Sequence, residues 1–151
     1  MAQEAIEVFA PILIQIGKAV PFRQPDYIKR LVRGSGPLKS GVYCYRFERF
    51  LLDGERDPLG DEVLEYAAAR QAASGLQAAL HLLKNQHLIP AELRDRYLVF
   101  AGVVMVHADG YWCTLCLEWL HNAWRLQWLW LSYNFPKSGL LISTEKFSTQ
   151  I

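Results

Sequence analysis

Residues 97–131 read YLVFAGVVMVHADGYWCTLCLEWLHNAWRLQWLWL, the most strongly patterned stretch of the chain. Apolar and polar residues alternate along much of it, with the period of two that is typical of a strand in a half-buried sheet. Asp109-Gly110 interrupts the first long run, and Asp-Gly between such runs is a strong hairpin signal. The sequence therefore predicts an antiparallel hairpin with a two-residue turn, which aligns His107 with Trp112.

A second turn is predicted at His121-Asn122. A two-residue turn there aligns Glu118 with Arg125, the acid of one strand opposite the base of the next, and such cross-strand pairs stabilise a sheet. A fourth strand is predicted to follow the PKSG turn and to cover 140–147. The C-terminal part is therefore expected to be an antiparallel meander of three to four strands.

In this register one face of the meander is almost wholly apolar. Burial of each large apolar side chain is worth about 1.5–3 kcal/mol, so this face is predicted to form the core. Its residues are Phe100, Val104, Val106, Cys113, Leu115, Leu117, Trp119, Trp124, Leu126, Trp128 and Trp130.

The opposite face is mixed, and it is too apolar to be left entirely in water. Trp112 lies on it beside the first turn, with Met105, Leu129 and Leu131 behind it. Exposed aromatic and apolar side chains of this kind are typical of the anchor cluster of a protein interface. We therefore predict an interface formed by these four residues and Arg125.

The first part of the chain favours helices. Residues 3–20 carry apolar side chains at spacings of three and four, and a shorter helix is predicted after Pro25. Residues 34–41 form a loop by composition, and residues 42–52 fit a strand or a helix equally well. The clearest helical pattern runs over about 61–86, opened by acidic residues that suit a helix N-terminus.

These elements predict a single α+β domain over 1–151, with a mainly helical part at 1–96 and a sheet at 97–151. The helices, one of them long, pack on one face of the antiparallel meander. This element order resembles the cystatin-like cone of the nuclear-transport-factor-two superfamily, although the sequence shows no clear pair of early strands. The resemblance rests on element order alone, and it implies a curved sheet whose concave face encloses a pocket.

The 151 residues are 52% hydrophobic and 21% charged, with a formal net charge of +1. This composition excludes a disordered chain, a collagen-like repeat and a uniformly basic protein. The charges are unevenly placed, because residues 18–49 are basic and residues 53–65 are acidic. The candidate anion-binding residues are Arg23, Lys29, Arg30, Arg33 and Lys39. They predict either a solvated basic surface, a nucleic-acid or phosphate site, or an interface for an acidic protein.

Histidines and cysteines near the turns invite a metal site, because zinc prefers such ligands. Residues three apart on a strand point to opposite faces, so Cys113 and Cys116 cannot converge on one ion. Only a helical segment would restore that site. His107 and Asp109 at a hairpin tip lack a pocket that excludes water. We therefore predict no metal and no cofactor, and we assign no catalytic residue, although the sequence does not exclude an enzyme.

No apolar run approaches the roughly 18 residues that span a bilayer, and no signal peptide is recognised. Three cysteines are an odd count in a chain that is large enough to fold without disulfides. The sequence predicts a cytoplasmic protein with no membrane partner.

Three functions remain open. The first is a small non-catalytic interaction factor of the adaptor, inhibitor or immunity type, which binds a protein partner or a second copy of itself as a homodimer through the mixed face. The second is a small-molecule or enzymatic pocket between the helix and the curved sheet, reached by His81 or Cys113. The third is nucleic-acid or phosphate binding through residues 18–49.

Overall fold

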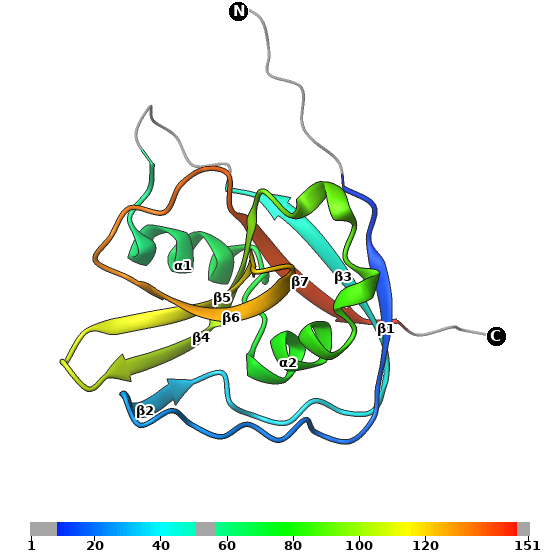
Figure 1. Cartoon of the computed structure of the whole chain (residues 1–151), viewed down its shortest axis with the longest axis horizontal. Coiled ribbons are helices and arrows are strands. Elements are labelled where there is room, and N and C mark those ends of the chain that lie inside the picture. Colours follow the sequence, from blue (N-terminus) through cyan, green and yellow to red (C-terminus); the bar gives the residue numbers. More distant parts are fainter. Residues whose placement is uncertain (1–8, 51–56, 148–151) are drawn as a thin grey trace, which may run out of the picture.

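The computed structural model describes residues 9–50 and 57–147. Within these ranges the chain forms a mixed seven-stranded sheet with a short α-helix on each face (Figure 1). The elements are β1 Ile12–Ile16, β2 Ile28–Arg33, β3 Gly41–Arg49, α1 Gly60–Ala69, α2 Leu76–Lys84, β4 Tyr97–His107, β5 Trp112–Leu120, β6 Ala123–Trp130 and β7 Leu140–Lys146, with single 3-10 turns at Gln86–Leu88 and Ala91–Leu93.

The strand order is β1-β3-β7-β4-β5-β6. β7 lies parallel to the start of β4, where Leu98 pairs with Leu140, and every other strand pairing is antiparallel. β2 also pairs with β4, further along the strand at Val104 to His107. One side of β4 is occupied by β5. The other side of β4 is therefore shared by β7 and β2.

The two helices cover opposite faces of the sheet. Leu76 and Leu82 of α2 pack with Phe100 and Leu117 in one buried cluster. Val63 and Leu64 of α1 pack in another, against side chains that point to the other face. These side chains are Val99, Ala101, Val104, Cys116, Leu131 and Leu141.

The predicted single helix over 61–86 is therefore wrong. It is broken at 70–75, where Gln71 has a φ of 55° and the chain passes from one face of the sheet to the other between β7 and β2. The N–H of Gly102 donates to the carbonyl of Ser74 at 2.9 Å, and the N–H of Leu76 donates to that of Gly34 at 2.7 Å. A Cβ on Gly102 would lie 2.5 Å from the carbonyl oxygen of Ala73, so only glycine permits this crossing.

The prediction of an N-terminal helix over 3–20 is also wrong for the described residues. Residues 12–16 form β1, with Ile14 and Ile16 buried and Leu13 exposed, which is the alternation of a strand. β2 replaces the short helix expected after Pro25, because the strand begins at Ile28. Of the two alternatives for 42–52, the strand is correct for the described part, which is β3; residues 51 and 52 lie outside the described residues.

The second predicted turn is confirmed. His121 and Asn122 have φ values of 52° and 63°, and Glu118 pairs with Arg125 as expected. β7 also appears where the fourth strand was predicted, although it joins β3 and β4 instead of extending the meander.

The first predicted register is wrong. Trp112 pairs with Val106 instead of His107, because the turn is a three-residue loop in which Gly110, at a φ of 89°, is the residue in the left-handed region. The register shifts again between Phe100 and Val104, where three residues of β4 bulge out to bond the crossing segment. This bulge exchanges the faces that the sequence predicts for several side chains of β4.

The predicted architecture, helices packed on one face of a three- to four-strand meander, is thus overturned. The first part of the chain supplies β1, β2 and β3, and the sheet has seven strands with a helix on each side. The resemblance to the cystatin-like cone fails with it, because the chain does not run from N-terminal helices to a C-terminal meander.

Candidate functional site

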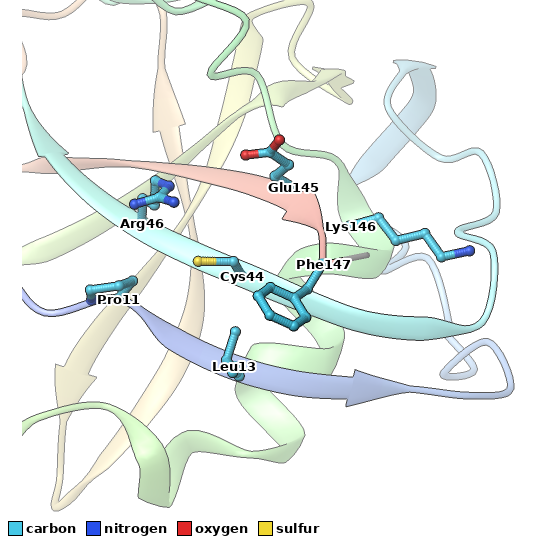
Figure 2. Close-up of a pocket in the computed structure, with 7 residues that line it drawn as sticks. All are labelled: Pro11, Leu13, Cys44, Arg46, Glu145, Lys146 and Phe147. Carbon is cyan, nitrogen blue, oxygen red and sulfur yellow. The ribbon is translucent and has the colours of Figure 1, made fainter. Parts of the chain in front are cut away.

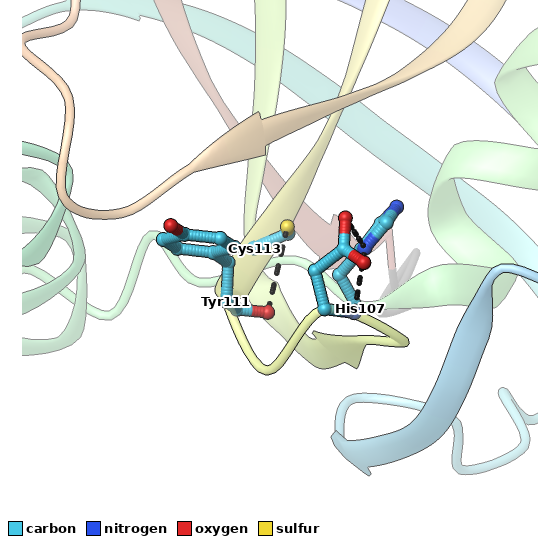
Figure 3. A network of polar contacts seen from close by, with 4 residues as sticks. His107, Tyr111 and Cys113 are labelled. Carbon is cyan, nitrogen blue, oxygen red and sulfur yellow. Dashed lines mark hydrogen bonds and ion pairs between the residues drawn. The ribbon is translucent and has the colours of Figure 1, made fainter.

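Trp112 is held at the surface by the tip of the β4–β5 hairpin. The N–H of His107 donates to the carbonyl of Tyr111 at 2.7 Å, and the N–H of Gly110 donates to that of His107 at 2.8 Å. Figure 3 shows the polar contacts at this tip, among them the Cys113 thiol with the Tyr111 carbonyl. The backbone that carries Trp112 is therefore fixed, and Trp112 itself is 47% exposed.

Two hollows of about 460 and 450 Å³ flank the Trp112 side chain. Asp61, Trp112 and Leu131 line both hollows. The second hollow has more lining residues, among them Val104 and Glu65. We call this surface the Trp112 groove. It lies between α1 and the β4–β5 hairpin, and it combines an apolar floor with two carboxylates from successive turns of α1.

The structure brings together part of the predicted interface. Leu129 and Leu131 lie on the same face as Trp112, packed in the cluster beneath α1. Met105 does not join them, because the bulge in β4 turns it to the opposite face, where it is wholly buried with Ile28. Arg125 stays on the predicted face, and its Nε donates to the carbonyl of Leu120 at 2.9 Å.

A group of aromatic rings on the other face was missed by the sequence reasoning. Trp130 contacts the rings of His107, Tyr111 and Tyr133, and His107 in turn stacks on Tyr27 at 5.7 Å between ring centroids. We call these five residues the aromatic row. The alternation of β6 placed Trp130 correctly on the face of Trp124. The cluster under α2 buries Trp124 but does not include Trp130, and Tyr27, Tyr111 and Tyr133 remain exposed.

The five candidate anion-binding residues all lie in the segment that joins β1 to β3. Each of them is exposed. Among the described residues, none of these five forms an ion pair. Arg33 and Glu65 both line the second hollow of the Trp112 groove. The acidic residues of α1 therefore approach the basic segment at one point without neutralising it.

Cys113 and Cys116 lie on opposite faces, as the strand prediction required. Cys113 packs with Met105, and Cys116 packs beneath α1. Burial raises the pKa of both thiols, with Glu118 adding to the effect at Cys116, so both side chains are held as neutral thiols. In the described part of the chain no group of three or more His, Cys, Asp or Glu side chains is placed to hold a metal ion.

His81 enters the buried side of α2, with 4% of its surface exposed. Its Nε2 has no hydrogen-bond partner, and burial, with Lys84 nearby, lowers its pKa. The space between α2 and the sheet is filled by apolar side chains such as Leu82 and Phe100. His81 therefore sits at the edge of a packed core, and this packing gives the predicted pocket no support.

A further hollow of about 500 Å³ lies on the face opposite α2, over β1, β3 and β7 (Figure 2). Cys44 forms its floor, Arg46 and Glu145 bring opposite charges, and Leu13 and Phe147 form apolar walls. No sequence pattern pointed to this hollow, because its residues come from three strands that the sequence does not place side by side.

The chain matches no protein-family model, and comparison with curated proteins and with solved structures finds no match. Within the described ranges, no helix is both long and apolar enough to cross a membrane.

Proposed function

We propose that the protein is a small non-catalytic interaction factor, of the adaptor, inhibitor or immunity type, which binds a protein partner at the Trp112 groove. The observation that carries this proposal is the position of Trp112. It is a large aromatic side chain, half exposed, on a rigid hairpin between two hollows. Tryptophans in such positions dominate the binding energy of many interfaces.

The chemistry of the groove indicates what the partner offers. Leu131 and Val104 supply an apolar floor, and Asp61 and Glu65 supply acidic groups on one wall. An apolar side chain with a lysine or arginine close to it would fill the hollow beside Tyr111, where Asp61 is the one charged lining residue, because the other hollow also carries Arg33. A positive charge on the partner, opposite the carboxylates at the edge of the groove, would speed association more than it would tighten binding.

The proposal is tested with three immobilised baits: the wild type, Trp112→Ala and Tyr133→Ala. Tyr133 is the matched control, because it is an exposed aromatic residue outside the groove, with 63% of its surface exposed. A lysate of the source organism is passed over each bait, and the captured proteins are quantified by mass spectrometry. We expect one protein to be retained by the wild type and Tyr133→Ala and to be lost at least tenfold from Trp112→Ala.

Self-association through the same groove is measured alongside. If the partner is a second copy, light scattering at rising concentration shows a dimer that Trp112→Ala abolishes and Tyr133→Ala keeps. Equal capture by all three baits, together with a mass that Trp112→Ala does not change, would overturn the proposal.

A further inference from the structure

The segment 17–40, which joins β1 to β3 and contains β2, runs along one side of the molecule (Figure 1). We call it the basic rim. It contains six basic side chains against the single acid Asp26, and all seven are exposed. None of the six forms an ion pair. The basic residues are Lys18, Arg23, Lys29, Arg30, Arg33 and Lys39.

The basic rim is anchored to the body of the protein at several points. The Gln77 side chain on α2 accepts from the N–H of Val20 at 2.9 Å and donates to its carbonyl at 3.1 Å. The carbonyl of Tyr27 accepts from the N–H of Ala108 in the hairpin loop, and β2 itself pairs with β4. The positive charges are therefore carried on an ordered backbone, and a ligand need not pay to order it.

The aromatic row begins inside this rim. Tyr27 precedes Lys29 by two residues, its ring stacks on His107, and 47% of its surface is exposed. Its hydroxyl also accepts from the Nε1–H of Trp128 at 3.2 Å. An open aromatic ring thus stands directly before β2, and the two exposed, unpaired cations Lys29 and Arg30 follow it in the sequence.

We propose that the basic rim binds single-stranded nucleic acid. The cations of β2 contact backbone phosphates, and a base stacks on Tyr27 at the end of the aromatic row. Non-specific single-strand binding uses this pairing of a positively charged track with aromatic rings, because every base offers a flat face. An acidic protein would use the charges alone and would leave the open ring without a role. The basic rim shares Val32 and Arg33 with the Trp112 groove, but Tyr27, Lys29 and Arg30 line neither hollow. The site at these three residues therefore stands independently of the function proposed above.

The probes are fluorescein-labelled oligo-dT and oligo-U of 12 nucleotides, measured by fluorescence anisotropy from 25 to 300 mM salt. Binding of both indicates that the rim reads phosphates and bases without the 2′-hydroxyl, and a preference for one identifies the natural strand. The Lys29→Ala/Arg30→Ala variant is expected to weaken binding and to reduce the salt slope by about 1.4, since each lost phosphate contact removes about 0.7. Arg33 is left intact because it also lines the Trp112 groove.

Two matched controls accompany this variant. Arg46→Ala/Lys84→Ala removes the same charge from exposed positions outside the rim and is expected to keep the wild-type slope. Tyr27→Phe keeps the ring and is expected to bind like the wild type, whereas Tyr27→Ala is expected to bind about tenfold more weakly.

Three outcomes would overturn the proposal. The first is the absence of binding by the wild type at low salt, and the second is an equal loss in the two double variants. The third is binding that Tyr27→Ala leaves unchanged while poly-glutamate competes as well as oligo-dT, which would identify an acidic protein as the ligand.

Discussion

The side-chain amide of Gln86 bonds both backbone groups of Trp124. Its Oε1 accepts from the Trp124 N–H at 2.9 Å, and its Nε2 donates to the Trp124 carbonyl at 3.4 Å. β6 pairs only with β5, so one side of this aromatic strand is a free edge. At one residue, Gln86 takes the place of the missing neighbouring strand, which is a way of limiting edge-to-edge association.

We expect Gln86→Ala to lower the free energy of unfolding by about 1–2 kcal/mol, because both bonds to Trp124 and a third, from Nε2 to the Leu83 carbonyl at 3.2 Å, are lost. The newly open edge should also raise concentration-dependent association. Urea unfolding and light scattering check the two effects. Gln86→Glu is the control: its carboxylate still accepts from Trp124 but cannot donate, so an intermediate loss is expected. A variant Gln86→Ala as stable as the wild type would contradict this account.

Gly102→Ala is expected to destabilise the fold by about 3 kcal/mol, because the added Cβ would meet the carbonyl oxygens of Ala73 and Ser74 at 2.5 and 2.6 Å. All of the nearest atoms belong to the backbone of one segment, which leaves little room for relaxation. Gly36→Ala is the matched control, since nothing lies within 4 Å of its added Cβ, and it should change stability by less than about 0.5 kcal/mol. Chemical denaturation measures both, and equal values would refute the crossing described here.

Thr114 stabilises the bulge in β4 from the neighbouring strand. Its buried hydroxyl lies 2.7 Å from the Val103 carbonyl and 3.2 Å from that of Phe100. We expect Thr114→Val, which keeps the shape but removes the hydroxyl, to cost about 1–3 kcal/mol, because buried carbonyls lose their donor. Thr114→Ser should retain most of the stability. Hydrogen exchange at Gly102 and Val103 should increase in the valine variant alone.

His81 predicts a pH dependence of stability. Burial lowers its pKa in the folded state, so the unfolded state binds the proton more readily. The free energy of unfolding therefore keeps its full contribution from His81 above the unfolded pKa of about 6.5. That contribution is lost as the pH drops below this value. His81→Gln should therefore show a smaller loss of stability than the wild type between pH 7.5 and 5. Parallel denaturation curves for the two proteins across this range would refute the assignment.

The β5–β6 hairpin was predictable because its register depends on local chemistry. His121 and Asn122 both adopt positive φ, and the pairing of Glu118 with Arg125 agrees with the turn. The β4–β5 register was not predictable, because the turn at Gly110 is a three-residue loop and the bulge beyond it depends on a distant segment, whose Ser74 bonds Gly102. A bulge that accommodates a distant segment leaves no mark in the periodicity of its own strand.

The sequence of β1 contains a strand pattern, but a helical pattern overlaps it. Ile12, Ile14 and Ile16 alternate, yet apolar residues at spacings of three and four favoured a helix. For the candidate site, exposure of Trp112 followed from its place beside the turn. The stacking of Tyr27 on His107 did not, because it depends on the pairing of β2 with β4, which the sequence does not indicate.

β7 follows every other strand in the sequence, and it alone connects β1 and β3 to the rest of the sheet. Its contact with β4 is short, formed by the pairs Leu98 with Leu140 and Val99 with Leu141. On the ribosome, β1 and β3 are synthesised first but cannot join the sheet until β7 has emerged. We therefore expect β1 and β3 to join the sheet late in folding, because their place in it depends on contacts that are distant in the sequence.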